Sequence, residues 1–384
     1  MHIGIDGSRC DGEEPTGVER YASLVIPPLV AELHRRGHRV TLYVHHQPVH
    51  PYPDVRTRVI RVPRLWTHVG LGPAAIMDRV DRLFVPAHVL PLLRPRFSAV
   101  VLHDACFEEV PEVYAWLDRW YLRLTTADAL RTARVLTHSP ASARAFYTIY
   151  RPRRDTVTVV PPAAPPVRGA VLPVPWPQPY LLCIGRIERK KNLATLLRAF
   201  DRLIAQRPGL PHHLVLLGDD GLGSASIHRL HESLSTRARV HFHGYADETL
   251  RDVALRTASG LVLPSLCEGS SLVLLEARVS RLPFASSGCL PCREAGGTDG
   301  IYVEEPRNLD AWVIALTALI DRPRAPAPPP ERSWADVARA VADVLTAPDA
   351  SYQNSKLKRQ NVGIAFGDDD DSRHARSAHG NFDL

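Results

Sequence analysis

Short apolar runs alternate with longer segments of helical periodicity along most of the chain. Near the amino terminus, a run at residues 2–6 precedes a glycine-containing loop, apolar positions at helical spacing over 18–36, and a second run at 39–44. A strand, a glycine loop, a helix and a strand in this order are typical of a parallel, doubly wound sheet. Further strands are predicted at residues 82–85, 99–102, 134–137 and 156–160.

A proline-rich segment then divides the chain. Residues 161–179 include eight prolines, which neither a helix interior nor a strand ladder accepts, so this segment is predicted to be an extended linker. A second series follows, with strands at 180–185, 213–218, 240–244 and 260–264 and helices at 193–205 and 250–258. We therefore expect an α/β protein of two Rossmann-like, doubly wound domains facing a cleft.

The predicted boundaries follow from these patterns. They are 1–165 for the amino-terminal domain, 166–179 for the linker, 180–325 for the carboxy-terminal domain, 330–347 for a last helix packing back on the first domain, and 348–384 for a disordered tail. The tail contains a run of four aspartates but few apolar residues, which favours disorder over a metal site.

Composition narrows the protein class. The 384 residues are 45% hydrophobic, yet no stretch is long and apolar enough for a membrane span, and the amino terminus does not resemble a secretory signal. The six cysteines are scattered and are not typical of a disulfide framework, so we expect a reducing cytoplasm. Cys289 and Cys292 form a lone CxxC motif, interpreted as ordinary loop cysteines.

The positive charge is unevenly distributed. The formal net charge is +6, and arginines crowd the region 119–154. One interpretation is a solvated basic surface, and the other is peripheral contact with an anionic membrane at its inner face or with a phosphate-bearing acceptor. Nucleic acid is not expected as a partner, because no motif for reading it is present.

The segment 261–277 is the richest in chemistry. An apolar strand is followed by Glu268 and by Gly269, which allows the backbone to approach a ligand closely. A helix is predicted to begin at Ser270 or Ser271, and its free N–H groups would suit a diphosphate. Glu276 lies five residues beyond Ser271, about 7 to 8 Å along the helix, which suits a ribose hydroxyl.

This segment, Glu-Gly-Ser-Ser-Leu-Val-Leu-Leu-Glu-Ala, resembles the paired-glutamate signature of the retaining glycosyltransferase family 4, which has the GT-B fold. Other stretches are similar to that family and follow in the expected order: 4–7 with 16–21, 102–104, 137–142, 159–162 and 185–193. The likeness extends over about residues 1 to 345 and is strongest over 180–277.

The resemblance implies a role for each matching residue. The residues expected to act in catalysis are His103 and Glu268 at the donor sugar, and Arg186 and Lys191 at the diphosphate. Those expected to bind the donor otherwise are Gly17, Gly185, Gly269, Ser270, Ser271, Leu272 and the ribose ligand Glu276. Fixed cations and a helix amino terminus would stabilise the charge that grows on a leaving nucleoside diphosphate.

The sequence and the resemblance together lead to expectations about metal use and stereochemistry. No Asp-x-Asp motif is found before the tail, so no metal or other cofactor is expected, and cationic side chains would act in its place. The predicted function is a retaining, hexosyltransferase-type enzyme. It would move a sugar from a UDP- or GDP-sugar to a glycan or lipid-linked acceptor, in cell-surface polysaccharide synthesis. No buried carboxylate nucleophile is evident, which favours front-face attack assisted by the leaving phosphate.

Departures from the family pattern leave alternatives open. Ser270-Ser271 stands where the family usually has Phe-Gly, and 277–284 replaces a usual run of small residues, so the resemblance is weakest at the sugar end of the site. One alternative is a non-catalytic nucleotide-sugar-binding partner subunit. Another is a nucleotide-sugar epimerase or a phosphorylase on the same fold.

Overall fold

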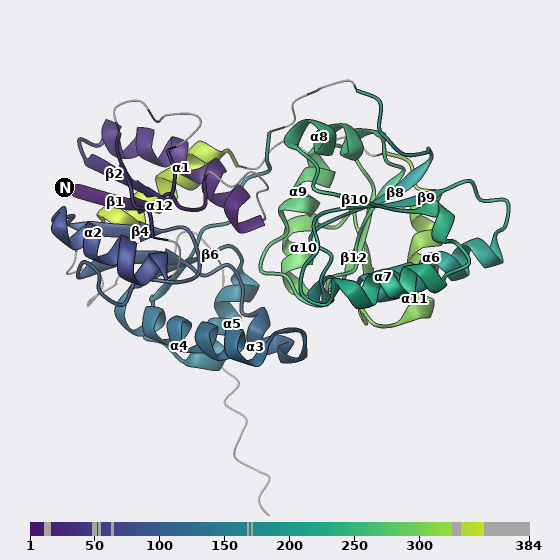
Figure 1. Ribbon diagram of the computed structural model, residues 1–384, viewed down its shortest axis with the longest axis horizontal. Coiled ribbons are helices and arrows are strands. Elements are labelled where there is room, and N and C mark those ends of the chain that lie inside the picture. The colour runs from purple at the N-terminus through teal and green to yellow at the C-terminus, as the bar shows by residue number, and fades with distance from the viewer. Residues whose placement is uncertain are drawn as a thin grey trace, which may run out of the picture. The chain divides into compact units, whose positions relative to one another are not determined.

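The computed structural model describes residues 1–10, 17–47, 52, 55–62, 65–166, 169, 172–324 and 332–348. It contains two parallel sheets, each covered by helices on both faces (Figure 1). The first sheet has the strand order β3-β2-β1-β4-β5-β6-β7. Its strands are β1 (His2–Asp6), β2 (Arg39–Val44), β3 (Arg56–Val59), β4 (Arg82–Val85), β5 (Phe97–Val101), β6 (Arg134–Thr137) and β7 (Val157–Val159).

The second sheet has the order β10-β9-β8-β11-β12-β13. Its strands are β8 (Tyr180–Ile184), β9 (His213–Leu217), β10 (Val240–Gly244), β11 (Gly260–Leu263), β12 (Phe284–Ser287) and β13 (Ile301–Val303). All described pairings in both sheets are parallel. The predicted architecture of two doubly wound, parallel sheets is thus confirmed.

Successive strand residues point to opposite faces of the first sheet, and each face forms its own core. Ile3 and Ile5 pack with α1 (Gly17–Arg35) and α12 (Trp334–Thr346). On the other face, Leu83 and Val85 pack with helices from the same half of the chain. These are α2 (Gly72–Met77), α4 (Trp116–Thr132) and α5 (Pro140–Tyr150), with α3 (Cys106–Glu109) and the short turns η1 (Trp66–Leu71) and η2 (Pro111–Val113) between them.

The second sheet is covered in the same way. One face packs against α6 (Leu193–Gln206), α7 (Ser224–Ser233) and α11 (Leu309–Ile320), and the other against α8 (Glu248–Thr257), α9 (Leu272–Val279) and α10 (Leu290–Gly296). The short turns η3 (Arg189–Lys191) and η4 (Arg237–Arg239) precede α6 and β10. Burial on both faces explains why its central strands are almost entirely apolar.

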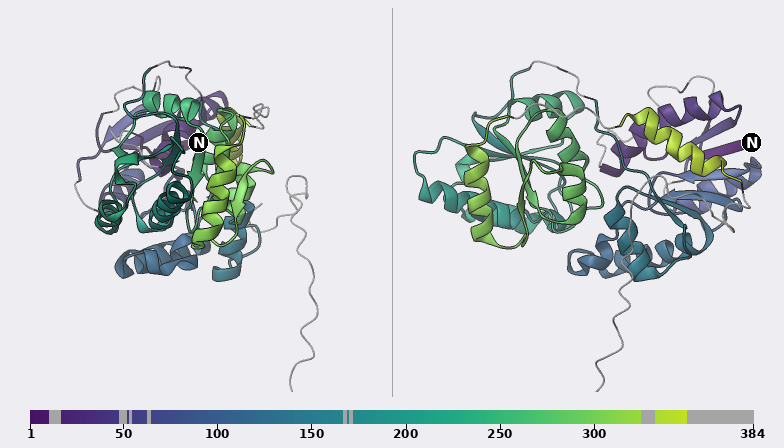
Figure 2. Two further views of the ribbon diagram at one scale, coloured as in Figure 1. Left: turned by 90° about the vertical axis from the view of Figure 1, so that its right-hand side faces the viewer. Right: turned by 180° about the vertical axis from the view of Figure 1, so that it is seen from behind.

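The last helix, α12, returns to the amino-terminal domain. It begins with a capping box formed by Ser333 and Asp336, and its buried face packs along α1 (Figure 2). Residues 349–384 of the predicted tail, and 167–168 and 170–171 of the predicted linker, lie outside the described residues. No described helix has both the length and the apolar character that crossing a bilayer requires.

Three strands were absent from the sequence prediction. β3 is the edge strand Arg-Thr-Arg-Val, β12 is Phe-Ala-Ser-Ser, and β13 has only three residues. Arginines, small serines and short length hide the apolar signal on which strand prediction depends.

Candidate functional site

The candidate site lies where the strand order of the second sheet reverses. From β8 the chain builds outward through β9 to β10, and then returns to place β11 on the other side of β8. The loops that leave β8 and β11 must therefore diverge to opposite faces, which opens a crevice at the carboxyl ends of these strands. The loop after β8 contains Lys191, and the loop after β11 contains Glu268.

Hydrogen bonds connect these two loops. The backbone N–H of Leu266 donates to the carbonyl of Lys190 over 2.9 Å. The side-chain amide of Asn192 donates to the carbonyl of Pro264 over 3.1 Å. Asn192 has a φ of 52°, a left-handed conformation that asparagine tolerates well, and α6 begins with the next residue. The loops are thus fixed relative to each other before any ligand binds.

Lys191 and Glu268 meet in this crevice. The Nζ of Lys191 lies 2.7 Å from the Oε1 of Glu268, with 18% and 11% of their side chains exposed. Burial raises the pKa of the Glu268 carboxyl, but Lys191 and Lys190 outweigh this effect and lower the pKa below its usual value. Glu268 is therefore a carboxylate at neutral pH, and it orients a partly buried ammonium group.

The backbone on both sides of the Lys191–Glu268 pair leaves room for Lys191 and presents a helix amino terminus. Gly185 has a φ of 150°, and a Cβ placed there would lie 3.2 Å from the Cε of Lys191. On the other side, Ser271 caps α9 by accepting the N–H of Leu274 over 3.2 Å, and α9 begins at Leu272. The helix start predicted near Ser270 and Ser271 is confirmed, and this helix amino terminus favours an anion.

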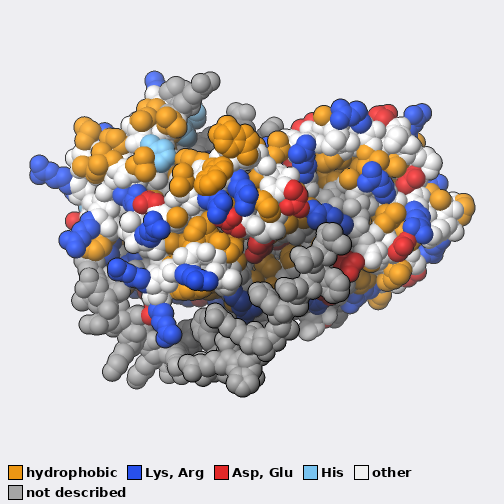
Figure 3. Space-filling view, turned by 90° about the horizontal axis from the view of Figure 1, so that it is seen from below, with side chains coloured by type: hydrophobic (Ala, Val, Ile, Leu, Met, Phe, Trp, Pro, Cys, Tyr) orange, Lys and Arg blue, Asp and Glu red, His pale blue; other side chains and the backbone are white. Residues whose placement is uncertain are grey.

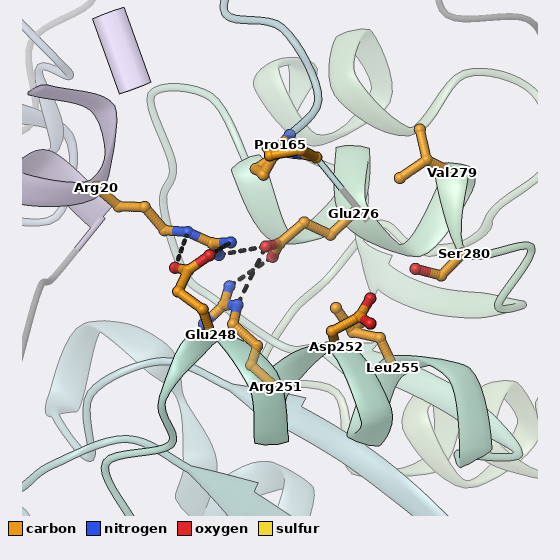
Figure 4. Close-up of a pocket in the computed structure, with 10 residues that line it drawn as sticks. Arg20, Pro165, Glu248, Arg251, Asp252, Leu255, Glu276, Val279 and Ser280 are labelled. Carbon is orange, nitrogen blue, oxygen red and sulfur yellow. Dashed lines mark hydrogen bonds and ion pairs between the residues drawn. The ribbon is translucent and has the colours of Figure 1, made fainter. Parts of the chain in front are cut away.

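Glu276 is buried within α9 and bound by two arginines (Figure 4). Arg20, from α1 of the other domain, contacts its Oε1, and Arg251 donates to the same oxygen from Nε over 3.1 Å. The Arg20 Nε also lies 3.0 Å from the Oε1 of Glu248. Burial raises the pKa of the Glu276 carboxyl, but Arg251 and Arg20 outweigh burial and lower it.

The cavity beside Glu276 measures about 10 Å³, which is room for about one water molecule. Arginine side chains thus stand where the sequence predicts a ribose. A ribose can reach Glu276 only after Arg20 or Arg251 moves.

His103 follows β5, on the amino-terminal side of the site. Its Nε2 lies 2.9 Å from the carbonyl of Pro86, and its Nδ1 lies 2.9 Å from the Nε2 of His138. Since the carbonyl only accepts, Nε2 carries a proton and Nδ1 accepts from His138. Burial lowers the pKa of His103, so the ring is neutral with both nitrogens engaged.

The loop containing Glu268 touches the amino-terminal domain directly. A Cβ at Gly269 would overlap the carbonyl of His103, so only glycine allows this approach. The Oγ of Ser142 donates to the carbonyl of Gly269 over 3.1 Å, and Lys190 Nζ lies 3.5 Å from the Oδ2 of Asp104. These contacts hold the loops of Glu268 and Lys190 against the amino-terminal domain.

A disulfide between Cys106 and Cys267 joins the domains at the same place. The expectation of unpaired cysteines is therefore wrong for these two, because residues 161 positions apart meet only through the fold. Cys289 and Cys292 are not in a disulfide. They are not the loop residues that were predicted, because Cys289 is the N-cap of α10 and Cys292 is buried within that helix. Cys106, Cys267 and Glu109 are also the described residues whose ligand atoms are grouped closely enough for a metal, but the disulfide occupies both sulfurs here.

A cleft of about 340 Å³ adjoins Glu268. It lies between the start of α3, helix α5 and the start of α10, and its polar lining includes Glu109, Arg144 and Glu268. Burial raises the pKa of Glu109. A ligand bound in this cleft would contact Glu268.

The structure brings together Glu268, Lys191, Gly185, Gly269, Ser271 and the backbone of His103. Arg186 is exposed and donates to the carbonyl of Asp220 over 3.2 Å, so its side chain is not at the pair. Gly17 is the first residue of α1, and a Cβ there would meet nothing within 4 Å. The loop before it, residues 11–16, lies outside the described residues.

Sequence reasoning missed Arg20, Arg251 and Asp104 as site residues. Arg20 stands within the stretch 16–21 that resembles the family, and Asp104 directly follows His103. Both residues could therefore have been predicted from the sequence, because each lies within or beside a stretch that resembles the family. Arg251 had none, because it reaches Glu276 from a different helix.

Comparison with known proteins agrees with this geometry. Residues 178–322 match the family described as Glycosyl transferases group 1. A D-inositol 3-phosphate glycosyltransferase of Rhodococcus erythropolis is 28% identical over 245 residues, which is 58% of this chain and 55% of that protein. The O-antigen chain mannosyltransferase B of Escherichia coli is 25% identical over 301 residues, 75% of each chain. The chain thus spans only about half the length of several curated relatives that it matches.

Solved structures share the fold. WaaG, a glycosyltransferase involved in lipopolysaccharide biosynthesis, superposes with a TM-score of 0.68 at 17% identity, over 91% of this chain and all of that one. Anabaena HepE, solved in complex with UDP and glucose, gives a TM-score of 0.59 at 16% identity, over 89% of this chain and 94% of that one. The resemblance to glycosyltransferases stated from the motifs is confirmed by the match of residues 178–322 to Glycosyl transferases group 1, and these structures confirm the fold.

Proposed function

We propose that this chain, with residues 178–322 matching Glycosyl transferases group 1 and with a GT-B fold, transfers a sugar from a nucleoside-diphosphate sugar to an acceptor. The observation that carries the proposal is the Lys191–Glu268 ion pair at the reversal point of the second sheet. A cation and a carboxylate there, beside the amino terminus of α9, provide complementary contacts for a diphosphate and a sugar hydroxyl.

The chemistry assigns a distinct role to each group. As the sugar leaves the diphosphate, negative charge increases on the phosphate oxygens, and Lys191 with the first N–H groups of α9 stabilises it. Glu268 holds Lys191 in place and accepts hydrogen bonds from sugar hydroxyls. The acceptor enters through the cleft between α5 and α10, which adjoins Glu268.

We further propose that the transfer retains the anomeric configuration, through front-face attack by the acceptor assisted by the leaving phosphate. The carboxylates nearest the site, Glu268 and Asp104, are already paired with Lys191 and Lys190. Such pairing suits them for positioning rather than for nucleophilic attack. Proton NMR of the first-formed product tests this point, and an inverted anomeric centre would contradict it.

The donor class is a UDP- or GDP-sugar, and the transferred group is a hexose. Lys191 takes the charge-neutralising role of a metal ion, so activity should be unchanged by EDTA. The acceptor is a glycan or a lipid-linked glycan, and the product serves cell-surface polysaccharide synthesis. The glycan-related names of WaaG and the O-antigen mannosyltransferase support this class of acceptor.

The test begins with binding. The purified full chain is screened by thermal shift against UDP-, GDP- and other nucleotide sugars, because a donor that binds the native state raises the melting temperature. Hits are then assayed for release of nucleoside diphosphate and for sugar transfer. Lys191→Gln is expected to lower kcat about 100-fold. Arg229→Gln, at an exposed position on α7, is the matched control and should leave kcat unchanged.

A second candidate function is a non-catalytic nucleotide-sugar-binding subunit. The feature in its favour is the pair Ser270-Ser271, which stands where the family usually has Phe-Gly, beside the sugar-binding Glu268. Transfer by the purified single chain would exclude it. Donor binding without turnover, together with unchanged cellular glycan after Glu268→Gln, would favour it over the enzyme.

A further inference from the structure

Helix α4 presents a row of large apolar side chains to solvent. They are Trp116, Leu117, Trp120, Tyr121 and Leu124, with between 44% and 70% of each exposed. At about 100° of rotation per residue, the row falls within an arc of about 140° on one side of the helix. The opposite side is buried against the sheet, through Thr126, Ala129 and Leu130. The helix is therefore apolar on both sides, although within the described part of the chain only the side with Thr126, Ala129 and Leu130 packs against the sheet.

Neighbouring segments extend this surface. The ring of His68 connects them: its Nε2 lies 2.9 Å from the Tyr121 hydroxyl, and its Nδ1 accepts the N–H of Leu92 over 3.3 Å. Three more apolar side chains beside this ring are Val69, Leu92 and Leu93, which are 54%, 75% and 56% exposed. We call these eight residues the α4 apolar surface. An apolar patch of several adjoining large side chains marks an interaction site more often than chance exposure does.

Basic groups border the α4 apolar surface. Arg131 continues the row along α4 and is exposed, and the guanidinium of Arg123 lies 5.1 Å from the Trp120 ring centre. Glu108 binds Arg123 Nε over 2.8 Å and accepts the Tyr150 hydroxyl over 2.8 Å, which places the end of α5 beside α4. Exposed arginines follow directly after Tyr150, at positions 151, 153 and 154.

The carboxylates of this region do not cancel that charge: exposed Asp155 offsets only one of the three arginines at 151, 153 and 154. Glu108 is engaged by Arg119, Arg123 and Tyr150, and Asp128 lies 2.7 Å from Arg94. Asp118 projects from α4 about 130° away from the middle of the apolar row. Figure 3 views the molecule from the side on which α4 and α5 lie in Figure 1, and shows hydrophobic and basic side chains interspersed there.

We propose that the α4 apolar surface docks the protein on an anionic lipid bilayer. Helix α4 lies in the plane of the interface, with its tryptophans and leucines among the upper acyl chains and Tyr121 at headgroup level. The arginines at 131, 151, 153 and 154 contact lipid phosphates. Two copies of the chain pairing through this surface would bring these arginines toward their counterparts, which disfavours a dimer.

Docking in this way would bring the membrane close to the cleft beside Glu268. The Arg119 Nε donates to the carbonyl of Phe107 over 3.0 Å, so α4 is attached to α3. Ala105 and Glu109, on either side of Phe107, line the cleft. A lipid-linked acceptor could then reach Glu268 while its lipid stays in the bilayer. The surface itself goes beyond the transferase proposal and does not depend on it.

The test is co-sedimentation of the purified full chain with vesicles of phosphatidylcholine alone or mixed with phosphatidylglycerol, without any sugar nucleotide. We expect binding to the mixed vesicles that weakens at high salt. The double substitution Trp116→Ser and Trp120→Ser should lower binding about tenfold or more. Arg153→Gln with Arg154→Gln should lower it by a similar factor and reduce its salt dependence.

The matched control is Ile314→Ser, which removes an equally exposed (70%) apolar side chain from α11 in the other domain and should bind as the unaltered chain does. Quenching of tryptophan fluorescence by brominated lipid should disappear in the double tryptophan variant. Equal binding of that variant and the unaltered chain would overturn the proposal. So would a dimer that depends on Trp116 and Trp120 in a chain that does not bind vesicles. Neither outcome bears on sugar transfer, which is assayed separately.

Discussion

Arg20 and Glu276 form an ion pair across the two domains, although they are 256 positions apart in the sequence. Only 8% of the Arg20 side chain and 5% of the Glu276 side chain are exposed. Two buried charges in contact have lost their hydration, so each depends on the other for compensation. The pair therefore holds the domains together. Arg20 also covers the carboxylate of Glu276, which the family resemblance implies as the ligand of the donor ribose.

Replacing Arg20 separates these two effects. Arg20→Ala should destabilise the chain by about 3 kcal/mol, because Glu276 loses one of its two buried partners. If Glu276 also binds ribose, the variant should bind the donor more tightly, since one competitor has been removed. Chemical unfolding and calorimetric titration measure the two quantities. Arg229→Ala, at an exposed position on α7, is the control and should change neither. Unchanged stability in Arg20→Ala would contradict the pairing.

Gly269 sets the distance between the Glu268 loop and the amino-terminal domain. Gly269→Ala would place a Cβ against the His103 carbonyl and 2.7 Å from the Asp104 Cβ, so the backbone must shift. We expect a loss of stability of about 1–3 kcal/mol, measured by urea unfolding. Gly209→Ala is the control, because a Cβ there meets nothing within 4 Å. Equal stabilities would show that the loop does not rest on His103 in solution.

The sequence was most informative where a feature is local. The apolar strands that end in glycine loops and the cap at Ser271 depend on neighbouring residues, and both were predicted. The Lys191–Glu268 pair was also within reach, since both residues belong to stretches that resemble a known family. The strands β1 and β8 were predicted because burial on both faces makes them apolar throughout. The strand β12 was missed because half of its residues are serines.

Contacts between the domains were beyond sequence reasoning. Arg20 with Glu276, Lys190 with Asp104, and Cys106 with Cys267 each join residues from separate halves of the chain. No periodicity links such positions, because their proximity depends on how the two sheets are brought together. The exposed row on α4 was hidden for another reason: its apolar spacing alone is equally typical of a buried helix face.

The Cys106–Cys267 disulfide should make stability sensitive to reductant. It closes a loop of 161 residues, for which the chain-entropy model gives about 5 kcal/mol as an upper value. A melting temperature measured with and without dithiothreitol should fall on reduction. Cys106→Ser should start from the lower value and lose the response, whereas the control Cys10→Ser should keep it. Finding six free thiols in protein purified without reductant would contradict the disulfide.

Buried histidines near the site should make the fold sensitive to acid. Burial lowers the pKa of His88 from 6.5 to about 4, so its neutral form is favoured in the folded state. Between these two values the unfolded chain binds more protons than the folded chain, and stability therefore rises with pH. The contribution of His88 is complete above pH 6.5 and is lost as the pH falls toward 4, by up to about 3 kcal/mol.

Urea unfolding measured across this pH range tests the effect. His88→Gln keeps a polar group near Thr126, whose Oγ1 lies 3.0 Å from the His88 Nε2, but it does not titrate. The variant should show a shallower loss of stability between pH 6.5 and 4 than the unaltered chain. Arg229→Gln, at an exposed position on α7, is the control and should keep the original slope. If His88→Gln and the unaltered chain lose stability in parallel, His88 is not held neutral by burial.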